Sequence, residues 1–419
     1  MHILILAIKS ILNRKFTIAL TIFSIALSIM LLLGVERLRN DARESFANTI
    51  SGTDLIVGAR SGPVQLMLYA VFRIGDPTNN VSWESYQDIK NQRLVDWTIP
   101  ISLGDSHRGF RVLGTNPDYF NHYQYGGGRT LALAEGSRFD DVYDAVLGAD
   151  VARELGYSLD QEIVLAHGTG EVSFVKHTDK PFRVVGILER TGTPVDRTVH
   201  VSLEGIEAIH IGWESGAPTP GRQVGAEQAR RMDLQPKSIT AVLVGLKSRI
   251  AAFRVQRFIN EYPEEPLQAA LPGVALQELW DTMAIAQKAL LVISVLVVLV
   301  GISGMATAIL TSLNERRREM AVLRSVGARP WHIFALFVGE AGVVMLIASI
   351  IGVAALYAAQ FIARPIIQAQ LGLFIPIHPP SSHELLLLAA AIGAGLLVGL
   401  IPAYRAYRYS LADGMTIRL

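Results

Sequence analysis

The sequence contains no cysteine, and this absence removes several kinds of chemistry at once. Without thiols the chain forms no disulfide, holds no thiolate zinc site and has no cysteine nucleophile. Charge is scarce as well: Asp, Glu, Lys and Arg make up 18% of the 419 residues, and the formal net charge is +1. Because bulk charge is balanced, composition gives no indication of nucleic-acid binding, and we expect no nucleic-acid partner.

Common catalytic and nucleotide-binding motifs are also missing from the sequence. There is no Gly-x-x-x-x-Gly-Lys-Ser/Thr phosphate loop, no His-Glu-x-x-His, no Gly-x-Ser-x-Gly and no Gly-x-Gly-x-x-Gly fingerprint. The glycine run 126–128 lacks a strand–helix frame and predicts a turn. We therefore expect neither an enzyme nor a cofactor or catalytic site in this chain.

Apolar residues, in contrast, make up half of the chain and gather in four long runs. A run of about 20 apolar residues is long enough to cross a bilayer. The runs predict transmembrane helices at 16–35, 284–312, 331–360 and 385–403. A cleaved signal peptide is the alternative for the first run, but Glu36-Arg37-Leu38-Arg39 follows it instead of an Ala-x-Ala site, which favours an uncleaved anchor.

Lys and Arg flank one side of these runs, and this bias sets the predicted topology. It places the N-terminal segment 1–15, the loop 313–330 and the tail 404–419 in the cytoplasm, and the loop 361–384 outside. Residues 36–283 then form a large external domain with stalk helices. The predicted fold class is a membrane α-helical protein of four transmembrane helices, with a large α+β extracytoplasmic domain inserted between helices 1 and 2.

Compact apolar runs and helical patterns indicate the elements of the external domain. Strands are predicted at 144–147, 162–166, 182–188, 239–246 and about 268–276, and helices at 83–90, 149–155, 203–209 and 249–260. The order of strand, helix 249–260 and strand predicts a βαβ-like unit before the second span. The polar stretch 214–237 is interpreted as a mobile loop.

Six of the ten histidines fall in this domain: His107, His122, His167, His177, His200 and His210. They are scattered singly, whereas a metal site needs three or four ligands in a constrained geometry. We interpret them as surface or strand-facing residues and assign no metal ligand, although ligands distant in sequence can converge in space.

Two features inside or between the spans carry polar chemistry. Glu340 is the one acid well inside an apolar run, and no second acid or base lies well inside the predicted spans to relay a proton. We therefore favour a structural, hydrogen-bonded role for Glu340 over an ion pathway. Small residues in the spans (Gly301, Gly304, Ala306, Gly393, Gly395 and Gly399) predict close helix contacts.

The basic segment 314–330 lies between the second and third spans. Its arginines predict a cytoplasmic position, and its apolar spacing predicts a short helix lying flat under the bilayer that ends at Gly327. Such a helix, held between two spans, is well placed to receive a push from a cytoplasmic partner. A basic loop that only fixes topology is the alternative interpretation.

The layout of one span, a large external domain and three further spans resembles the MacB/LolC/FtsX type of ABC transporter permease. The basic segment resembles that family's coupling loop and reads Arg316-x-x-Glu319-Met320-Ala321-x-x-Arg324-Ser325-x-Gly327-Ala328. Met320, Ala321 and Ser325 depart from the family's Ile, Gly and Ala. The tail Pro402-Ala403-x-x-Ala406, ending near 412–415, and the external segments 146–156 and 182–188 carry further resemblance to MacB-like proteins.

The resemblance implies a permease that docks on a separate ABC ATPase subunit, which would bind the ATP and Mg, and that pairs with a second permease copy as a homodimer or heterodimer. Arg316, Arg318, Glu319 and Arg324 would contact the ATPase, with Gly327 and Ala328 shaping the bend. It also implies a multi-pass protein of the bacterial inner membrane with its large domain in the periplasm. Membrane lipids and a periplasmic adaptor, binding protein or lipoprotein would be further partners.

The function implied is mechanical: ATPase motion would move the external domain and drive export or extrusion of a lipoprotein, peptide, drug or lipid. Two alternatives stay open. One is an FtsX-like signal transmitter that activates an external partner, and the other is the permease of a zinc-linked ABC system, motivated by the external histidines.

Overall fold

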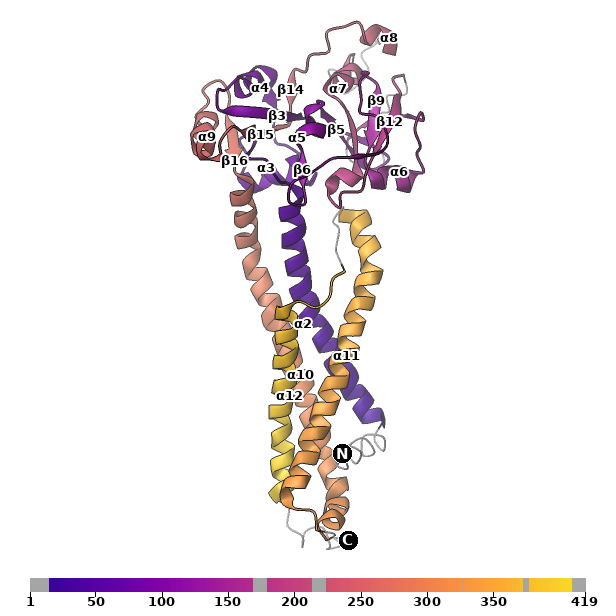
Figure 1. Cartoon of the computed structure of the whole chain (residues 1–419), viewed down its shortest axis with the longest axis vertical. Coiled ribbons are helices and arrows are strands. Elements are labelled where there is room, and N and C mark those ends of the chain that lie inside the picture. Colours follow the sequence, from indigo (N-terminus) through magenta and orange to yellow (C-terminus); the bar gives the residue numbers. More distant parts are fainter. Residues whose placement is uncertain (1–14, 169–178, 213–223, 326, 372–376, 409–419) are drawn as a thin grey trace. The chain divides into compact units, whose positions relative to one another are not determined.

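The computed structural model describes residues 15–168, 179–212, 224–325, 327–371 and 377–408 (Figure 1). The chain divides into two compact units. We call the first, 1–42, 284–366 and 375–419, the membrane unit, and the second, 43–283 and 367–374, the external unit. Each is described by itself.

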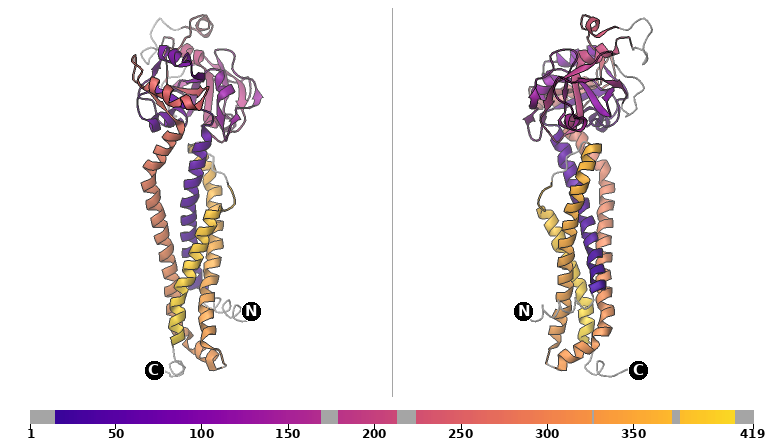
Figure 2. Two further views of the ribbon diagram at one scale, coloured as in Figure 1. Left: turned by 60° about the vertical axis from the view of Figure 1, so that its left-hand side comes forward. Right: turned by 90° about the vertical axis from the view of Figure 1, so that its right-hand side faces the viewer.

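Four long helices build the membrane unit: α2 (Lys15–Thr49), α10 (Pro272–Ser325), α11 (Pro330–Leu371) and α12 (Ser382–Arg408). Each contains a stretch long and apolar enough to cross a membrane: Lys15–Thr49, Pro272–Leu313, Trp331–Ile367 and Ser382–Ala406. The four predicted spans are therefore confirmed as helices, and the stretches are longer than predicted. Figure 2 shows the four helices running side by side.

Small residues let these helices approach closely, as predicted for Gly301, Gly395 and Gly399. A Cβ at Gly301 would lie 3.2 Å from Ser28 Oγ of α2. Ser28 Oγ itself donates hydrogen bonds to Ser24 O (2.8 Å) and across to Val297 O of α10 (3.2 Å). A Cβ at Gly399 would crowd Ala341, and one at Gly395 would crowd Met345. Gly304 and Gly393 face open space instead, so the prediction was wrong for these two.

The basic segment does not form a separate short helix, which corrects the sequence-based expectation. The helix α10 continues without a break through Ser325, so residues 314–325 are its last three turns. No Gly or Pro separates Leu313 from Ser325, and the chain first leaves the helix near Gly327, whose φ of +97° is left-handed. The helix α11 then begins at Pro330, a residue suited to a first helical turn.

A four-stranded antiparallel sheet forms one part of the external unit, in the order β16-β1-β15-β3. Its strands are β16 (Leu267–Ala270), β1 (Leu55–Ala59), β15 (Ala241–Leu246) and β3 (Val95–Ile101). Every residue of β1 is buried, because Leu55 and Val57 face one apolar cluster and Ile56 faces another. The helix α9 (Ala252–Asn260) joins β15 to β16, and both strands run antiparallel to β1 and thus parallel to each other. This confirms the βαβ-like unit.

A larger mixed sheet has the order β10-β12-β9-β13-β5-β4-β11, with β8 paired to β12. Its strands are β10 (Glu162–Ile163), β12 (Phe182–Leu188), β9 (Asp144–Leu147), β13 (Thr198–Ser202), β5 (Phe110–Thr115), β4 (Asp105–His107), β11 (Ala166–His167) and β8 (Leu133–Gly136). The helices α6 (Ala149–Leu155) and α7 (Leu203–His210) add apolar side chains to the core of this sheet. The sheet brings β4, β11 and the end of α7 into one region, which matters below.

The remaining elements are short: α3 (Pro63–Ala70), β2 (Val81–Ser82), α4 (Trp83–Lys90), α5 (Asp118–His122), β6 (Gln124–Tyr125), β7 (Arg129–Thr130), η1 (Pro194–Arg197), α8 (Ala226–Ala229), β14 (Ser238–Ile239) and η2 (Arg249–Ala251). The predicted bounds of α4, α6, β9 and β12 are confirmed. The strand predicted at about 268–276 was too long, because Pro272 starts α10. The stretch 214–237 contains α8, and its residues 214–223 lie outside the described ones.

His200 lies fully buried in β13, near the rings of Tyr119 and Phe120. Burial and the positive charge of Arg73 together lower the pKa of His200 to about 3, although a hydrogen bond to Val146 O opposes this. The imidazole is therefore neutral in the folded protein at neutral pH.

Acid should consequently destabilise the external unit through His200. The folded pKa lies below the ordinary value of 6.5, so stability is full above pH 6.5 and falls toward pH 3, by about 1.4 kcal/mol per pH unit inside that window. Urea unfolding of the full-length chain in detergent, followed by circular dichroism between pH 7.5 and 4.5, measures the slope. The variant His200→Leu should flatten it, whereas the control His122→Leu should not; an unchanged slope in His200→Leu would contradict this.

Candidate functional site

The predicted coupling segment ends α10 and leads into α11. Met320 is buried in the apolar cluster of the membrane unit, which anchors the segment to the helices around it. Gly327 and Ala328 lie between the two helices, and Arg329 N donates to His332 Nδ1 (3.1 Å) at the start of α11. Arg316, Arg318, Glu319 and Arg324 lie on the helical backbone of α10, and their side chains are outside the described set. Their role in ATPase docking stays a prediction.

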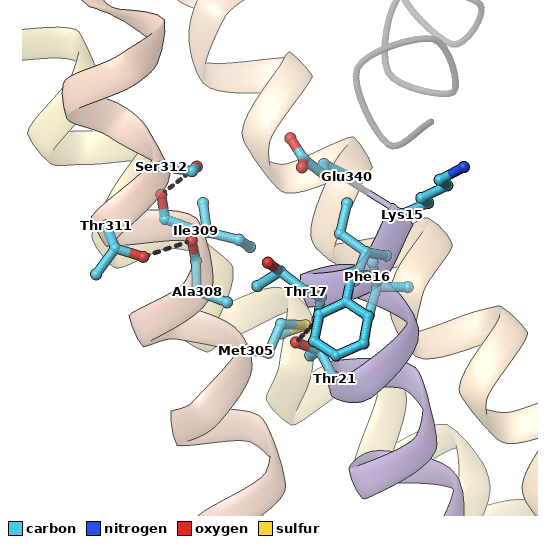
Figure 3. Close-up of a pocket in the computed structure, with 12 residues that line it drawn as sticks. Lys15, Phe16, Thr17, Thr21, Met305, Ala308, Ile309, Thr311, Ser312 and Glu340 are labelled. Atoms are coloured by element: carbon cyan, nitrogen blue, oxygen red, sulfur yellow. Dashed lines mark hydrogen bonds between the residues drawn. The ribbon is translucent and has the colours of Figure 1, made fainter. Parts of the chain in front are cut away.

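Glu340 borders a cavity of about 390 Å³ between α2, α10 and α11 (Figure 3). Lys15, Thr17 and Thr21 line it from α2, and Thr311 and Ser312 line it from α10. The hydroxyl groups of Thr21, Thr311 and Ser312 donate to backbone carbonyls of their own helices. Glu340 is 4% exposed and is the only acid among the described lining residues. The structural role of Glu340 stays a prediction.

A buried ion pair that the sequence analysis missed joins α2 to α12. Arg37 donates through Nε to Glu384 Oε1 (2.9 Å) and through Nη2 to Oε2 (2.8 Å), and both side chains are 2% exposed. Arg37 Nη1 also donates to Gln360 Oε1 of α11 (2.9 Å), and the guanidinium lies 4.8 Å from the ring centre of Tyr357. This two-pronged geometry is the strongest that Arg and a carboxylate can form. One arginine thereby fixes three helices to each other.

Further hydrogen bonds hold the two partners in place. Ser381 N donates to Glu384 Oε2 (3.1 Å) while Glu384 N donates to Ser381 Oγ (3.2 Å), which is a capping box at the start of α12. His378 Nε2 lies 2.9 Å from Asp41 Oδ1, and Tyr357 OH donates to His378 O (2.8 Å). The short segment before α12 is thus attached to both α2 and α11.

Arg37, Asp41 and Glu384 lie just outside the predicted spans 16–35 and 385–403, in the parts of α2 and α12 that extend beyond them. The sequence does carry a local signal for the start of α12, because Ser381-x-x-Glu384 is a capping-box sequence. Its pairing with Arg37, 347 residues away in the chain, could not be read from local patterns.

The external histidines have different surroundings. His107 is buried, with Nδ1 2.8 Å from Val164 O and Nε2 2.9 Å from Tyr157 OH. His122 stacks on Trp97, and His177 lies outside the described residues.

His167 and His210, by contrast, each place a ring nitrogen within 3.5 Å of one buried carboxylate oxygen, Asp105 Oδ1. The fold thus brings together two histidines that are distant in sequence, the possibility left open by the sequence.

Removing Arg37 alone should destabilise the membrane unit, because Glu384 would remain as a buried charge without its partner. Breaking one side of a buried pair costs about 3–5 kcal/mol, whereas replacing both partners by apolar residues is near neutral. We expect a lower unfolding temperature in detergent for Arg37→Met and substantial recovery in Arg37→Met with Glu384→Met. The exposed pair Arg230–Glu227 supplies the control, since Arg230→Met should change little. Equal loss in the single and double variants would contradict this account of the pair.

Comparison with known families covers most of the chain. The model of the MacB-like periplasmic core domain matches residues 18–257, and the model of the FtsX-like permease C-terminal region matches residues 291–411.

Similar proteins include macrolide export ATP-binding/permease proteins MacB. The protein from a Shewanella species is 24% identical over 327 residues, which are 77% of this chain and 45% of the relative. That from Bordetella avium is 25% identical over 300 residues, 70% of this chain and 42% of the relative. That from Marinobacter nauticus is 36% identical over 114 residues, 27% of this chain and 17% of the relative. The chain thus spans less than half the length of these relatives.

Among solved structures, the periplasmic region of MacB from Actinobacillus actinomycetemcomitans matches with a TM-score of 0.35 and 11% identity, covering 55% of this chain and 94% of that one. The extracellular domain of the transporter YknZ from Gram-positive bacteria matches with a TM-score of 0.30 and 12% identity, covering 52% of this chain and 98% of that one. The resemblance noted from the coupling segment and the span layout is confirmed by the two family models. The chain belongs to the MacB/FtsX-type family of ABC transporter permeases, with a MacB-like periplasmic core domain and an FtsX-like membrane part.

Proposed function

We propose that this permease converts ATP hydrolysis by an ABC ATPase partner into movement of its external unit, and that the movement drives export or extrusion of a substrate beyond the membrane. The observation that carries the proposal is the extent of α10. One helix contributes 272–283 to the external unit, then forms an apolar stretch, and ends in the basic residues of the coupling segment. A force applied at residues 314–325 would act on α10, the same continuous helix whose first residues belong to the external unit.

The left-handed Gly327 supports this role for the segment. It follows the end of α10 at Ser325, and only two residues, Ala328 and Arg329, separate it from the start of α11 at Pro330. A partner that docks on Arg316, Arg318, Glu319 and Arg324 would therefore push on two helices through one short connection. Arginine suits such docking because its planar guanidinium pairs with carboxylates in two-pronged fashion.

The interior of the membrane unit supports mechanical work over passage of a solute between the helices. Glu340 is the only acid among the described residues that line the cavity, and the hydroxyl groups there are bonded to their own helices. Arg37 and Glu384 satisfy each other and fasten three helices. A bundle with compensated charges and close small-residue contacts moves as a body, and the substrate would meet the external unit only. Lipoproteins, peptides, drugs and lipids are the substrate classes that such extrusion serves.

The assembly we propose has one ATP-binding partner, carrying ATP and Mg, for each permease copy. The similar MacB proteins are named ATP-binding/permease proteins, so their names assign both functions to one polypeptide. For this chain, which lacks a phosphate-loop sequence, we assign nucleotide chemistry to a partner subunit. A second permease copy would complete the complex in the bacterial inner membrane, with the external unit in the periplasm next to an adaptor, binding protein or lipoprotein.

The double variant Glu319→Ala with Arg324→Ala tests the coupling role. The two substitutions remove one negative and one positive charge, so the net charge of the segment is unchanged. Because alanine is a good helix former, the end of α10 should stay helical and membrane insertion should stay intact. We expect the reconstituted complex to hydrolyse ATP without substrate-dependent stimulation and to lose transport. Arg249→Ala, at an exposed position of the external unit, provides the control and should transport normally. Unchanged transport in the double variant would contradict the assignment of the coupling segment.

A further inference from the structure

We propose that Asp105, His167 and His210 form a three-ligand site for a divalent transition metal ion, of which Zn²⁺ is the best fit, on the external unit. The proposal does not depend on the proposed transport function. One ligand atom from each residue lies within 4.8 Å of the other two. The three residues come from β4, β11 and the end of α7, so the site exists only in the folded sheet.

The distances suit a tetrahedral ion. His167 Nδ1 lies 3.1 Å from Asp105 Oδ1, and His210 Nε2 lies 3.5 Å from the same oxygen. Zinc binds imidazole nitrogen and carboxylate oxygen at about 2.0–2.1 Å, and tetrahedral geometry then places two ligand atoms about 3.4 Å apart. Two of the three ligand-atom spacings are thus already close to those that an ion would impose, and the third is at most 4.8 Å.

The electrostatics of the cluster also point to a cation. Asp105 is 2% exposed, and a buried carboxylate needs a compensating positive charge. The rings of His167 and His210 stack with centroids 4.6 Å apart, and one ring nitrogen of each lies within 3.5 Å of the same Asp105 oxygen. One divalent ion would compensate the buried carboxylate and accept a lone pair from each imidazole.

The backbone holds the three residues in place. His167 and Asp105 are directly opposed in the antiparallel pairing of β4 and β11. The helix α7, which ends at His210, is fixed by Lys180 Nζ, which donates to Ala208 O (2.8 Å). His107, next to this group in sequence, has both ring nitrogens occupied by Val164 O and Tyr157 OH and is excluded as a ligand.

Access and ligand chemistry define the kind of site. The side chains of His167 and His210 are 29% and 32% exposed, so an ion can enter from solvent. Two imidazole nitrogens and one carboxylate oxygen suit Zn²⁺ and neighbouring transition metals, whereas Mg²⁺ and Ca²⁺ prefer all-oxygen sets. Three protein ligands leave a fourth position open for water or for a donor atom of another molecule, as in exchangeable sites. The external unit would thus take up and release the metal ion.

Titration of the metal into the full-length chain in detergent tests the proposal. After removal of metals with a chelator, Zn²⁺ is added in competition with a chromogenic chelator, and the Co²⁺ complex is followed by its visible absorption. We expect one Zn²⁺ per wild-type chain, a tetrahedral Co²⁺ spectrum and a higher unfolding temperature with Zn²⁺ present. His167→Ala and His210→Ala should each weaken binding by at least about 100-fold, since loss of an outer-shell partner alone costs about 10–100-fold.

The control is His122→Ala, which removes an external histidine that stacks on Trp97 away from the cluster. It should bind Zn²⁺ as the wild type does. Asp105→Asn is informative only if it folds, because Asp105 is buried, and the two histidine variants keep the test independent of it. The proposal would be overturned if the wild type bound Zn²⁺ no more tightly than His210→Ala does. It would also be overturned if His122→Ala weakened Zn²⁺ binding as much as His167→Ala and His210→Ala do.

Discussion

The structure depends on uninterrupted backbone hydrogen bonding along α10, from Pro272 to Ser325. In a bilayer each peptide group must find its partner inside its own helix, so a span has no freedom to break within the apolar region. After Gly304 the sequence has no glycine or proline until Gly327 and Pro330, which follow the basic residues 316–324. The charged end of α10 therefore belongs to the same helix as the span, and residues 272–283 of this helix are assigned to the external unit. The proposed transmission of force follows from this continuity.

Charge compensation completes the membrane unit. Arg37 would be costly in an apolar surrounding by itself, but Glu384 and Gln360 satisfy its guanidinium, and Tyr357 lies against it. The capping box of α12 also holds Glu384 in place beside Arg37. Because the partners come from α2, α11 and α12, the pair restricts sliding of these helices against one another.

Local patterns predicted the elements whose ends carry local signals. The helix α4 begins where Ser82 accepts a hydrogen bond from Ser85 N, and α6 ends at Gly156, whose φ of +68° is left-handed. The apolar runs likewise predicted four membrane helices. The length of α10 was misjudged because a change from apolar to basic residues was interpreted as an end of helix, although it contained no breaker. Arg37–Glu384 and Asp105–His167–His210 join residues far apart in sequence, and only the fold brings them together.

The natural absence of cysteine allows the central claim to be tested by site-directed spin labelling. Labels at Glu84→Cys in α4 of the external unit and Leu386→Cys in α12 of the membrane unit, both exposed positions, would report the distance between the units by double electron–electron resonance. The reconstituted complex with its ATPase should show a shift of this distance when ATP binds, and the shift should disappear in Glu319→Ala with Arg324→Ala. An ATP-dependent distance that is the same with and without this double substitution, or no ATP dependence at all, would contradict force transmission through α10.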